Sequence, residues 1–158
     1  MIKSNQKLLT LIIVALLSLS SCEKDIDQAR DSLIGNWQVT EIYSYYGTRV
    51  NLGTSITQEF TEKGSLGTFE FTDEKVNFSF KRRDTLYTGS EPYTVSVENR
   101  NNGFTKSPFY TVTISSKNYN CKFGDETSDS QKNATNILLN YESPIGQPYS
   151  GYTLHLKK

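Results

Sequence analysis

The chain has 158 residues, in which 17 Lys and Arg balance 17 Asp and Glu. A chain without a basic excess has no electrostatic footprint for nucleic acid, so we expect no nucleic-acid partner. The 10 Tyr, 8 Phe and single Met favour β-strands over helices.

The first 21 residues have the layout of an export signal. Lys3 and Lys7 precede an apolar run over 8–19 that is too short to span a membrane comfortably. The four residues 19–22, Leu-Ser-Ser-Cys, resemble the lipobox that the lipoprotein signal peptidase recognises. This resemblance implies cleavage before Cys22 and lipidation of its thiol. An ordinary secretory signal with a coincidental cysteine is the alternative.

A lipid on Cys22 would tie the protein to a membrane, since stable anchoring takes about two acyl chains. Glu23, rather than Asp, follows the cysteine, so the familiar inner-membrane retention residue is missing. We therefore expect an outer-membrane lipoprotein of a Gram-negative cell envelope, on either face of that membrane. The chain then divides into a signal peptide (1–21), a lipidated polar tether (22–30) and one β-domain (31–158).

Apolar and polar residues alternate through most of this domain. Asp31-Ser32 is expected to cap a single helical turn that ends at Ile34. After Gly35 the period becomes two, which gives each segment one wet face and one buried face, as in an antiparallel sheet. The alternating segments are 37–46, 68–72, 75–81, 93–98, 110–115, 137–141 and 152–156.

Turn-forming residues separate these segments. The expected turns are Lys63-Gly64-Ser65, Asp73-Glu74 within a tight hairpin over 67–81, Asn101-Asn102-Gly103, and Gly146-Gln147-Pro148, with a long polar loop over 124–135. About eight short antiparallel strands in sequential order predict an all-β fold, specifically an up-and-down barrel. A sandwich of two sheets is the alternative, because alternation alone does not distinguish closure from the packing of two sheets.

The segment 33–37, Leu-Ile-Gly-Asn-Trp, resembles the start of the lipocalins and of the lipocalin-like domains of bacterial lipoproteins. The resemblance covers 31–157 and implies a lipocalin-like barrel in which Gly35 lets the chain enter the barrel floor and Trp37 plugs the closed end. The sequence departs from the family because no Arg follows the last strand to stack on the Trp; only Lys157 and Lys158 stand there. The Thr-Asp-Tyr motif and the C-terminal helix of the family are also missing.

No catalytic or metal-binding constellation stands out. His155, the single histidine, lies on the predicted wet face of its strand. Cys121 shares the apolar face of 119–123, which indicates a small buried hydrophobe rather than a nucleophile. The acidic residues of 125–129 lack the spacing of a calcium loop, and one Cys with one His does not form a zinc site. We therefore expect no catalytic residue, no metal and no cofactor.

Tyrosine is the most suggestive residue type, because it combines an apolar ring with a polar tip. We take Tyr43, Tyr45, Tyr141 and Tyr152 as candidate ligand-binding residues, although strand packing explains them equally well. The leading hypothesis is a non-enzymatic lipoprotein that binds a small apolar or amphipathic ligand at the open end of the barrel. The alternatives are an accessory or structural subunit that binds an envelope protein, and a glycan-binding module.

Overall fold

The computed structural model describes residues 25–50, 53–101, 106–124 and 134–158. The predicted signal peptide, the lipidation site Cys22, the Asn102-Gly103 turn and the acidic residues of 125–129 lie outside these ranges. In the part of the chain that is described, no helix is both long and apolar enough to cross a membrane.

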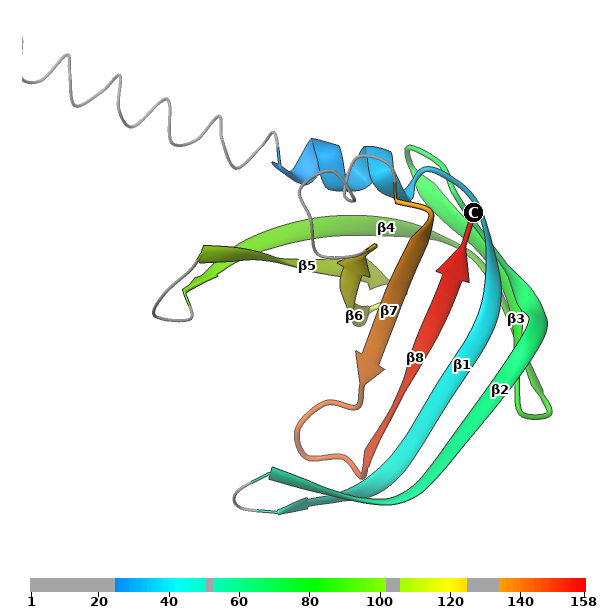
Figure 1. Ribbon diagram of the computed structural model, residues 1–158, viewed down its shortest axis with the longest axis vertical. Coiled ribbons are helices and arrows are strands. Elements are labelled where there is room, and N and C mark those ends of the chain that lie inside the picture. Colours follow the sequence, from blue (N-terminus) through cyan, green and yellow to red (C-terminus); the bar gives the residue numbers. More distant parts are fainter. Residues whose placement is uncertain (1–24, 51–52, 102–105, 125–133) are drawn as a thin grey trace, which may run out of the picture.

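Eight antiparallel strands form a closed barrel in which each strand pairs with its neighbours in sequence and the last strand pairs with the first (Figure 1). The strands are β1 (Gly35–Val50), β2 (Gly53–Phe71), β3 (Lys75–Arg82), β4 (Thr85–Asn101), β5 (Lys106–Ile114), β6 (Lys117–Phe123), β7 (Asn136–Glu142) and β8 (Tyr149–Lys157). The predicted all-β, up-and-down barrel is thus confirmed, and the two-sheet sandwich is wrong.

A short helix over 25–33 lies across one end of the barrel, beside the C-terminus (Figure 1). It is longer than the predicted turn, and Asp31-Ser32 lies in its last turn rather than at its start. Ala29 and Leu33 are 3% and 0% exposed, so this part of the expected tether packs on the barrel. A short, highly charged helix is stabilised mainly by such tertiary packing, which its local sequence does not reveal.

The turn predicted at Lys63-Gly64-Ser65 is wrong, because β2 continues through it. The register with β1 passes from Val39 opposite Gly67 to Glu41 opposite Lys63, so three residues of β2 face Thr40 alone. Gly64 has a φ of 126°, which a β-bulge of this kind accommodates. A glycine in an alternating segment marks a bulge as well as a turn, and here the bulge is the outcome.

Two other predicted turns are confirmed. Phe71 pairs with Val76 across the β2–β3 hairpin, and Gly146, with a φ of 95°, lies in the loop between β7 and β8. The β5–β6 hairpin turns at Ser115 and Ser116, whose φ angles are 49° and 64°. No glycine or asparagine marks that turn in the sequence, which is why the turn signals missed it.

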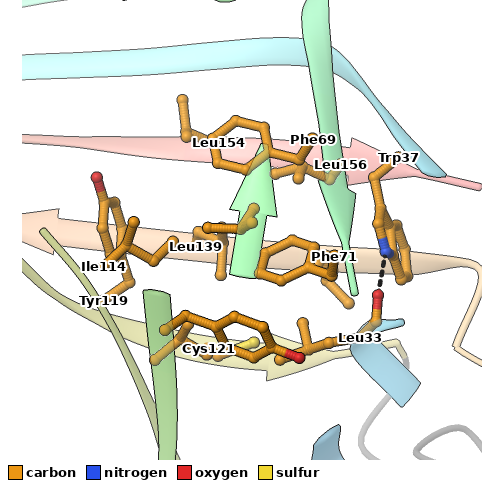
Figure 2. Close-up of a cluster of buried hydrophobic side chains, with 14 of the residues drawn as sticks. Leu33, Trp37, Phe69, Phe71, Ile114, Tyr119, Cys121, Leu139, Leu154 and Leu156 are labelled. Carbon is orange, nitrogen blue, oxygen red and sulfur yellow. Dashed lines mark hydrogen bonds between the residues drawn. The ribbon is translucent and has the colours of Figure 1, made fainter. Parts of the chain in front are cut away.

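The barrel has two distinct ends. The end covered by the helix, where β1 begins and β8 finishes, is called the closed end here. The opposite end, reached by the β1–β2 hairpin, the β3–β4 turn and the β7–β8 loop, is called the mouth. Apolar side chains from many strands fill the closed half of the interior (Figure 2); they include Trp37, Val39, Phe69, Phe71, Leu139, Leu154 and Leu156.

Candidate binding site at the barrel mouth

Trp37 closes the barrel at the helix end. Its side chain is 1% exposed, and its indole Nε1 donates a hydrogen bond of 2.6 Å to the carbonyl oxygen of Leu33 (Figure 2). The sequence placed Trp37 in the interior against this helical turn, and the structure has it there. Because the indole N–H is bonded and the ring is covered, Trp37 itself has no free polar group to offer a ligand.

Lys158, which follows the last strand, places a cation over the Trp37 ring. Its Nζ lies 4.8 Å from the centroid of the Trp37 ring and donates to the carbonyl oxygen of Ser32 at 3.3 Å. Its backbone N–H donates to the carbonyl oxygen of Thr135 at 2.9 Å. The last residue of the chain therefore ties the helix, the Trp37 ring and the start of β7 together.

At the mouth the interior changes from apolar to polar. Five inward-facing side chains meet there, which we call the tyrosine–arginine layer: Arg82, Tyr87, Tyr119, Tyr141 and Tyr152. The guanidinium carbon of Arg82 on β3 lies 4.2 Å from the ring centroid of Tyr152 on β8. Since β1 and β2 separate those strands in the barrel order, this contact crosses the interior.

Hydrogen bonds connect the same layer. Arg82 Nη2 donates to Tyr87 Oη at 3.1 Å, and the hydroxyls of Tyr119 and Tyr152 are hydrogen-bonded at 2.9 Å. The ring centroids of Tyr141 and Tyr152 are 5.2 Å apart. Tyr119 and Tyr152 are 6% and 5% exposed, so their hydroxyls lie in an interior of low polarity, where hydrogen bonds are strong.

Burial raises the pKa of Tyr119 above the ordinary tyrosine value, and the neighbouring Tyr152 hydroxyl adds to this effect. Burial also raises the pKa of Tyr152, although its hydrogen bond with Tyr119 and the positive charge of Arg82 act in the opposite direction. Both phenols are therefore protonated at neutral pH and can donate hydrogen bonds. The charge in this layer is that of Arg82.

Two buried polar atoms beside the layer have no hydrogen-bond partner among the described residues: Ser44 Oγ and Glu62 Oε1. Ser44 is 0% exposed and pairs laterally with Tyr152 on β8 and with Phe60 on β2. Glu62 faces the interior two residues further along β2, opposite Ile42. The mouth thus holds a hydroxyl and a carboxylate oxygen with unused hydrogen-bonding capacity.

The four candidate tyrosines do not form one site. Tyr141 and Tyr152 belong to the tyrosine–arginine layer inside the barrel, whereas Tyr43 and Tyr45 lie on the outer face. An extra residue in β1 causes this separation. Val39 pairs with Leu156 and Glu41 with the adjacent His155, so Thr40 is unpaired with β8 and exchanges the two faces of β1. Beyond it, Ile42 and Ser44 point inward; the even alternation expected over 37–46 would have pointed the tyrosines inward instead.

The outer tyrosines have a packing role. The Tyr45 ring lies 5.8 Å from that of Tyr43 and 5.5 Å from that of Tyr149. It covers Gly151 so closely that a Cβ at that glycine would stand 2.4 Å from Tyr45 Oη. An aromatic ring laid across a strand glycine shields the exposed backbone. Burial, followed by the charge of Glu142, raises the pKa of Tyr45, whose Oη hydrogen-bonds Glu142 at 3.3 Å.

Sequence reasoning did not assign Ser44, Glu62, Arg82, Tyr87 or Tyr119 to the site. Arg82 could have been found, because it continues the inward alternation of Val76, Phe78 and Phe80 by one more step. Ser44 could not, since its orientation depends on a bulge that involves the partner strand. The missed residues are all polar groups on an inner face that the hydrophobic pattern describes as apolar.

The remaining predicted residues are placed as follows. Cys121 is 6% exposed and burial raises the pKa of its thiol, as expected of a small buried hydrophobe. His155 lies half-buried on the outer face, opposite Leu138. Gly35 has a φ of 124° and lies next to the Lys158 side chain. Within the described ranges, no three His, Cys, Asp or Glu side chains gather as a metal site would require.

Comparisons with known proteins found no matching family model, no matching curated protein and no matching solved structure. The site at the mouth is therefore interpreted from its own geometry.

Proposed function

We propose that the chain is a non-enzymatic, outer-membrane lipoprotein whose lipocalin-like barrel binds a small amphipathic molecule at its mouth. The apolar part of the ligand would lie against the rings of Tyr141 and Tyr152. Its polar part would meet Ser44, Glu62 and the guanidinium of Arg82. Apolar walls with a few convergent polar groups are the usual composition of a small-molecule site.

The buried hydroxyl of Ser44 is the observation that carries this proposal. A buried polar group without a partner costs about 1–3 kcal/mol of stability, and alanine at the same position would avoid that cost. A ligand that accepts or donates a hydrogen bond at Ser44 removes the penalty on binding. The neighbouring carboxylate oxygen of Glu62 is in the same condition, so two unsatisfied groups converge on one region.

The tether determines how this barrel would face the membrane. Asp25 is three positions after Cys22, and three steps of extended chain span about 10 Å. The helix that follows packs on the closed end through Ala29 and Leu33. A lipid on Cys22 would then hold the closed end next to the bilayer and leave the mouth facing away from it.

Lipidation is tested by metabolic labelling with a palmitate analogue. The wild-type chain should incorporate the label into the membrane fraction, and Cys22→Ala should not. Equal labelling of both proteins would remove the membrane anchor from the proposal.

Ligand binding is tested with three small probes that each carry one aromatic ring and one group able to hydrogen-bond: benzylammonium, benzyl alcohol and benzoate. The full chain is held in lipid nanodiscs, empty nanodiscs serve as the blank, and saturation-transfer NMR gives the Kd. At least one probe should bind saturably, and Ser44→Ala should weaken it about 2–10-fold, the value of one hydrogen bond. Tyr43→Phe, on the outer face, should leave the Kd unchanged. Absence of saturable binding, or equal binding by Ser44→Ala, argues against the site.

A second candidate function is docking to an envelope protein. β2 pairs with β1 from Gly53 onward, but its pairs with β3 begin only at Gly67, which leaves a strand edge that a partner strand could extend. A photo-crosslinking amino acid at Thr61, within this edge, would then capture one discrete partner in cells. The same amino acid at Thr68, exposed on the same strand but paired with β1 on one side and β3 on the other, is the control and should capture none.

A further inference from the structure

The β1–β2 hairpin extends past β3 on the mouth side and carries its own cluster of inward-facing side chains. We name Tyr46, Phe60 and Glu62 the aromatic–acid site. The rings of Tyr46 and Phe60 meet edge to face, with centroids 6.2 Å apart and an interplanar angle of 74°. The faces of aromatic rings carry negative potential, and the Glu62 carboxylate lies on the same side of the strand as the Phe60 ring.

Arg83 occupies this site from the β3–β4 turn. Its guanidinium carbon lies 4.3 Å from the centroid of Phe60 and 5.9 Å from that of Tyr46. Its backbone N–H donates to Glu62 Oε2 at 2.7 Å. The arrangement of a cation on an aromatic face with a carboxylate at its side is how proteins recognise ammonium groups.

The backbone of Arg83 indicates that the contact, rather than the turn, accounts for an arginine here. Arg82 pairs with Thr85, so Arg83 and Asp84 form a two-residue turn, and Arg83 has a φ of 55°. Glycine is the residue favoured at such a position, and other residues adopt it at a conformational cost. The contact of the Arg83 side chain with the two rings, rather than the turn, therefore explains an arginine at this position.

Arg83 leaves the carboxylate only partly used. Glu62 meets its backbone amide, while Glu62 Oε1 is buried and, within the described residues, unpartnered. The ion pairs in the described part of the chain involve other acidic residues, namely Glu41, Asp84 and Glu98. A cation that contacts both rings and both carboxylate oxygens would complement this site better than Arg83 does.

We infer that the aromatic–acid site binds the positively charged head group of the ligand, and that Arg83 is its internal occupant, displaced when the ligand enters. The inference rests on the proposed function, which it makes more specific: the ligand is a cationic amphiphile, with an ammonium or guanidinium head. Ser44, paired with Phe60 on one side and Tyr152 on the other, joins this site to the tyrosine–arginine layer. Arg82, the other cation of the same turn, is directed to Tyr87 and Tyr152.

The experiment uses the same nanodisc preparation and the same three probes. Benzylammonium should bind more tightly than benzyl alcohol or benzoate. Arg83→Gly removes the internal occupant and suits the turn, so the variant should fold and should bind the cationic probe at least about threefold more tightly, the range expected for a cation–π contact. Glu62→Gln should weaken that probe, whereas Glu59→Gln, on the outer face of the same strand, should not. Asp84→Gly alters the same turn but keeps Arg83, and should leave the Kd unchanged.

The outcomes separate this inference from the function on which it rests. If benzyl alcohol or benzoate binds best, with Ser44→Ala weakening it, the mouth site stands and the cation site is overturned. If Arg83→Gly tightens all three probes equally, a merely wider mouth explains the gain and the inference is also overturned. If no probe binds any variant saturably, both proposals fall.

Discussion

The two ends of the barrel differ in how the polar groups buried in the interior are hydrogen-bonded. At the closed end, the Trp37 indole N–H donates a hydrogen bond to the Leu33 carbonyl oxygen, and the side-chain ammonium of Lys158 donates one to the Ser32 carbonyl oxygen. At the mouth, Ser44 Oγ and Glu62 Oε1 have no partner within the described residues. Arg30 Nε, on the helix that covers the closed end, is also unpartnered among these residues, so the contrast concerns the barrel interior: the Trp37 indole is bonded, whereas Ser44 and Glu62 keep free hydrogen-bonding capacity.

This difference indicates that the closed end mainly stabilises the fold, whereas the mouth is suited to binding. Buried polar groups in folded proteins are almost always paired, so unpaired ones concentrate where a ligand or a mechanism needs them. The closed end, with a fully buried tryptophan among apolar side chains, should hold most of the stability. The mouth should give up some stability to keep its polar groups available. Four measurements of the free energy of unfolding test this contrast.

The largest expected effect is at the closed end. Trp37→Ala removes a side chain that is 1% exposed, and such a truncation lowers the free energy of unfolding by about 3–5 kcal/mol. Chemical denaturation monitored by circular dichroism measures it. His155→Ala, on the outer face, should change the same quantity by no more than about 0.5 kcal/mol. A small effect of Trp37→Ala would mean that the closed end is not the stabilising half.

The second effect is a loss of stability at alkaline pH that originates at the mouth. Burial raises the pKa of Tyr119, so above the ordinary tyrosine pKa the unfolded chain loses a proton that the folded chain keeps. The free energy of unfolding is unaffected well below pH 10 and falls above it, by up to about 1.4 kcal/mol per pH unit for each such tyrosine. Tyr119→Phe should have a shallower slope between about pH 10 and 12 than the wild type. His155→Ala should retain the wild-type slope; if Tyr119→Phe also retains it, Tyr119 is not protected by burial.

The third effect compares two buried serines. Ser44 has an unpaired hydroxyl at the mouth, whereas the hydroxyl of Ser143 donates to the Pro148 carbonyl oxygen and accepts from the Ser150 amide. Ser44→Ala should therefore raise the free energy of unfolding by about 1 kcal/mol, and Ser143→Ala should lower it by a similar amount. Thermal unfolding of both variants checks the two signs. A destabilised Ser44→Ala would show that its hydroxyl is satisfied in the ligand-free protein.

The smallest effect concerns the C-terminal lysine. Lys158→Met removes the cation from the Trp37 ring and the hydrogen bond to Ser32, which should lower the free energy of unfolding by about 0.5–1 kcal/mol. Lys158→Arg should preserve it. The matched control is Lys157→Met, one residue earlier and exposed. Equal effects of the two methionine variants would leave Lys158 without a special role at the closed end.

Much of the fold could be predicted because alternation is a local property. The alternation over 75–81 and 110–115 predicts both a strand and its buried face. Asp73-Glu74 locates the hairpin between 68–72 and 75–81. Trp37 could be placed in the interior for the same reason. The candidate site could be predicted only in part: Tyr141 and Tyr152 lie in segments whose alternation is unbroken, so their inward direction follows from the pattern.

Where prediction failed, a distant segment decided the result. Tyr43 and Tyr45 face outward because Thr40 is an extra residue of β1 in its pairing with β8, a strand more than a hundred positions along the chain. Asp31-Ser32 did not begin the helix, because the helix is held by the barrel end on which Ala29 packs. Neither effect has a signal within the window of residues that it changes.

Local sequence was enough to establish an antiparallel all-β fold of sequential strands, because the order of wet and buried faces depends only on neighbouring residues. Closure of the sheet into a barrel, and the polar side chains that meet at its mouth, depend on the tertiary structure. Arg82 reaches Tyr152 across two intervening strands, Ser44 faces inward because of the bulge at Thr40, and Lys158 covers a ring 121 positions earlier in the chain. Barrel closure and register create these contacts, and both are properties of strand pairs rather than of any one strand.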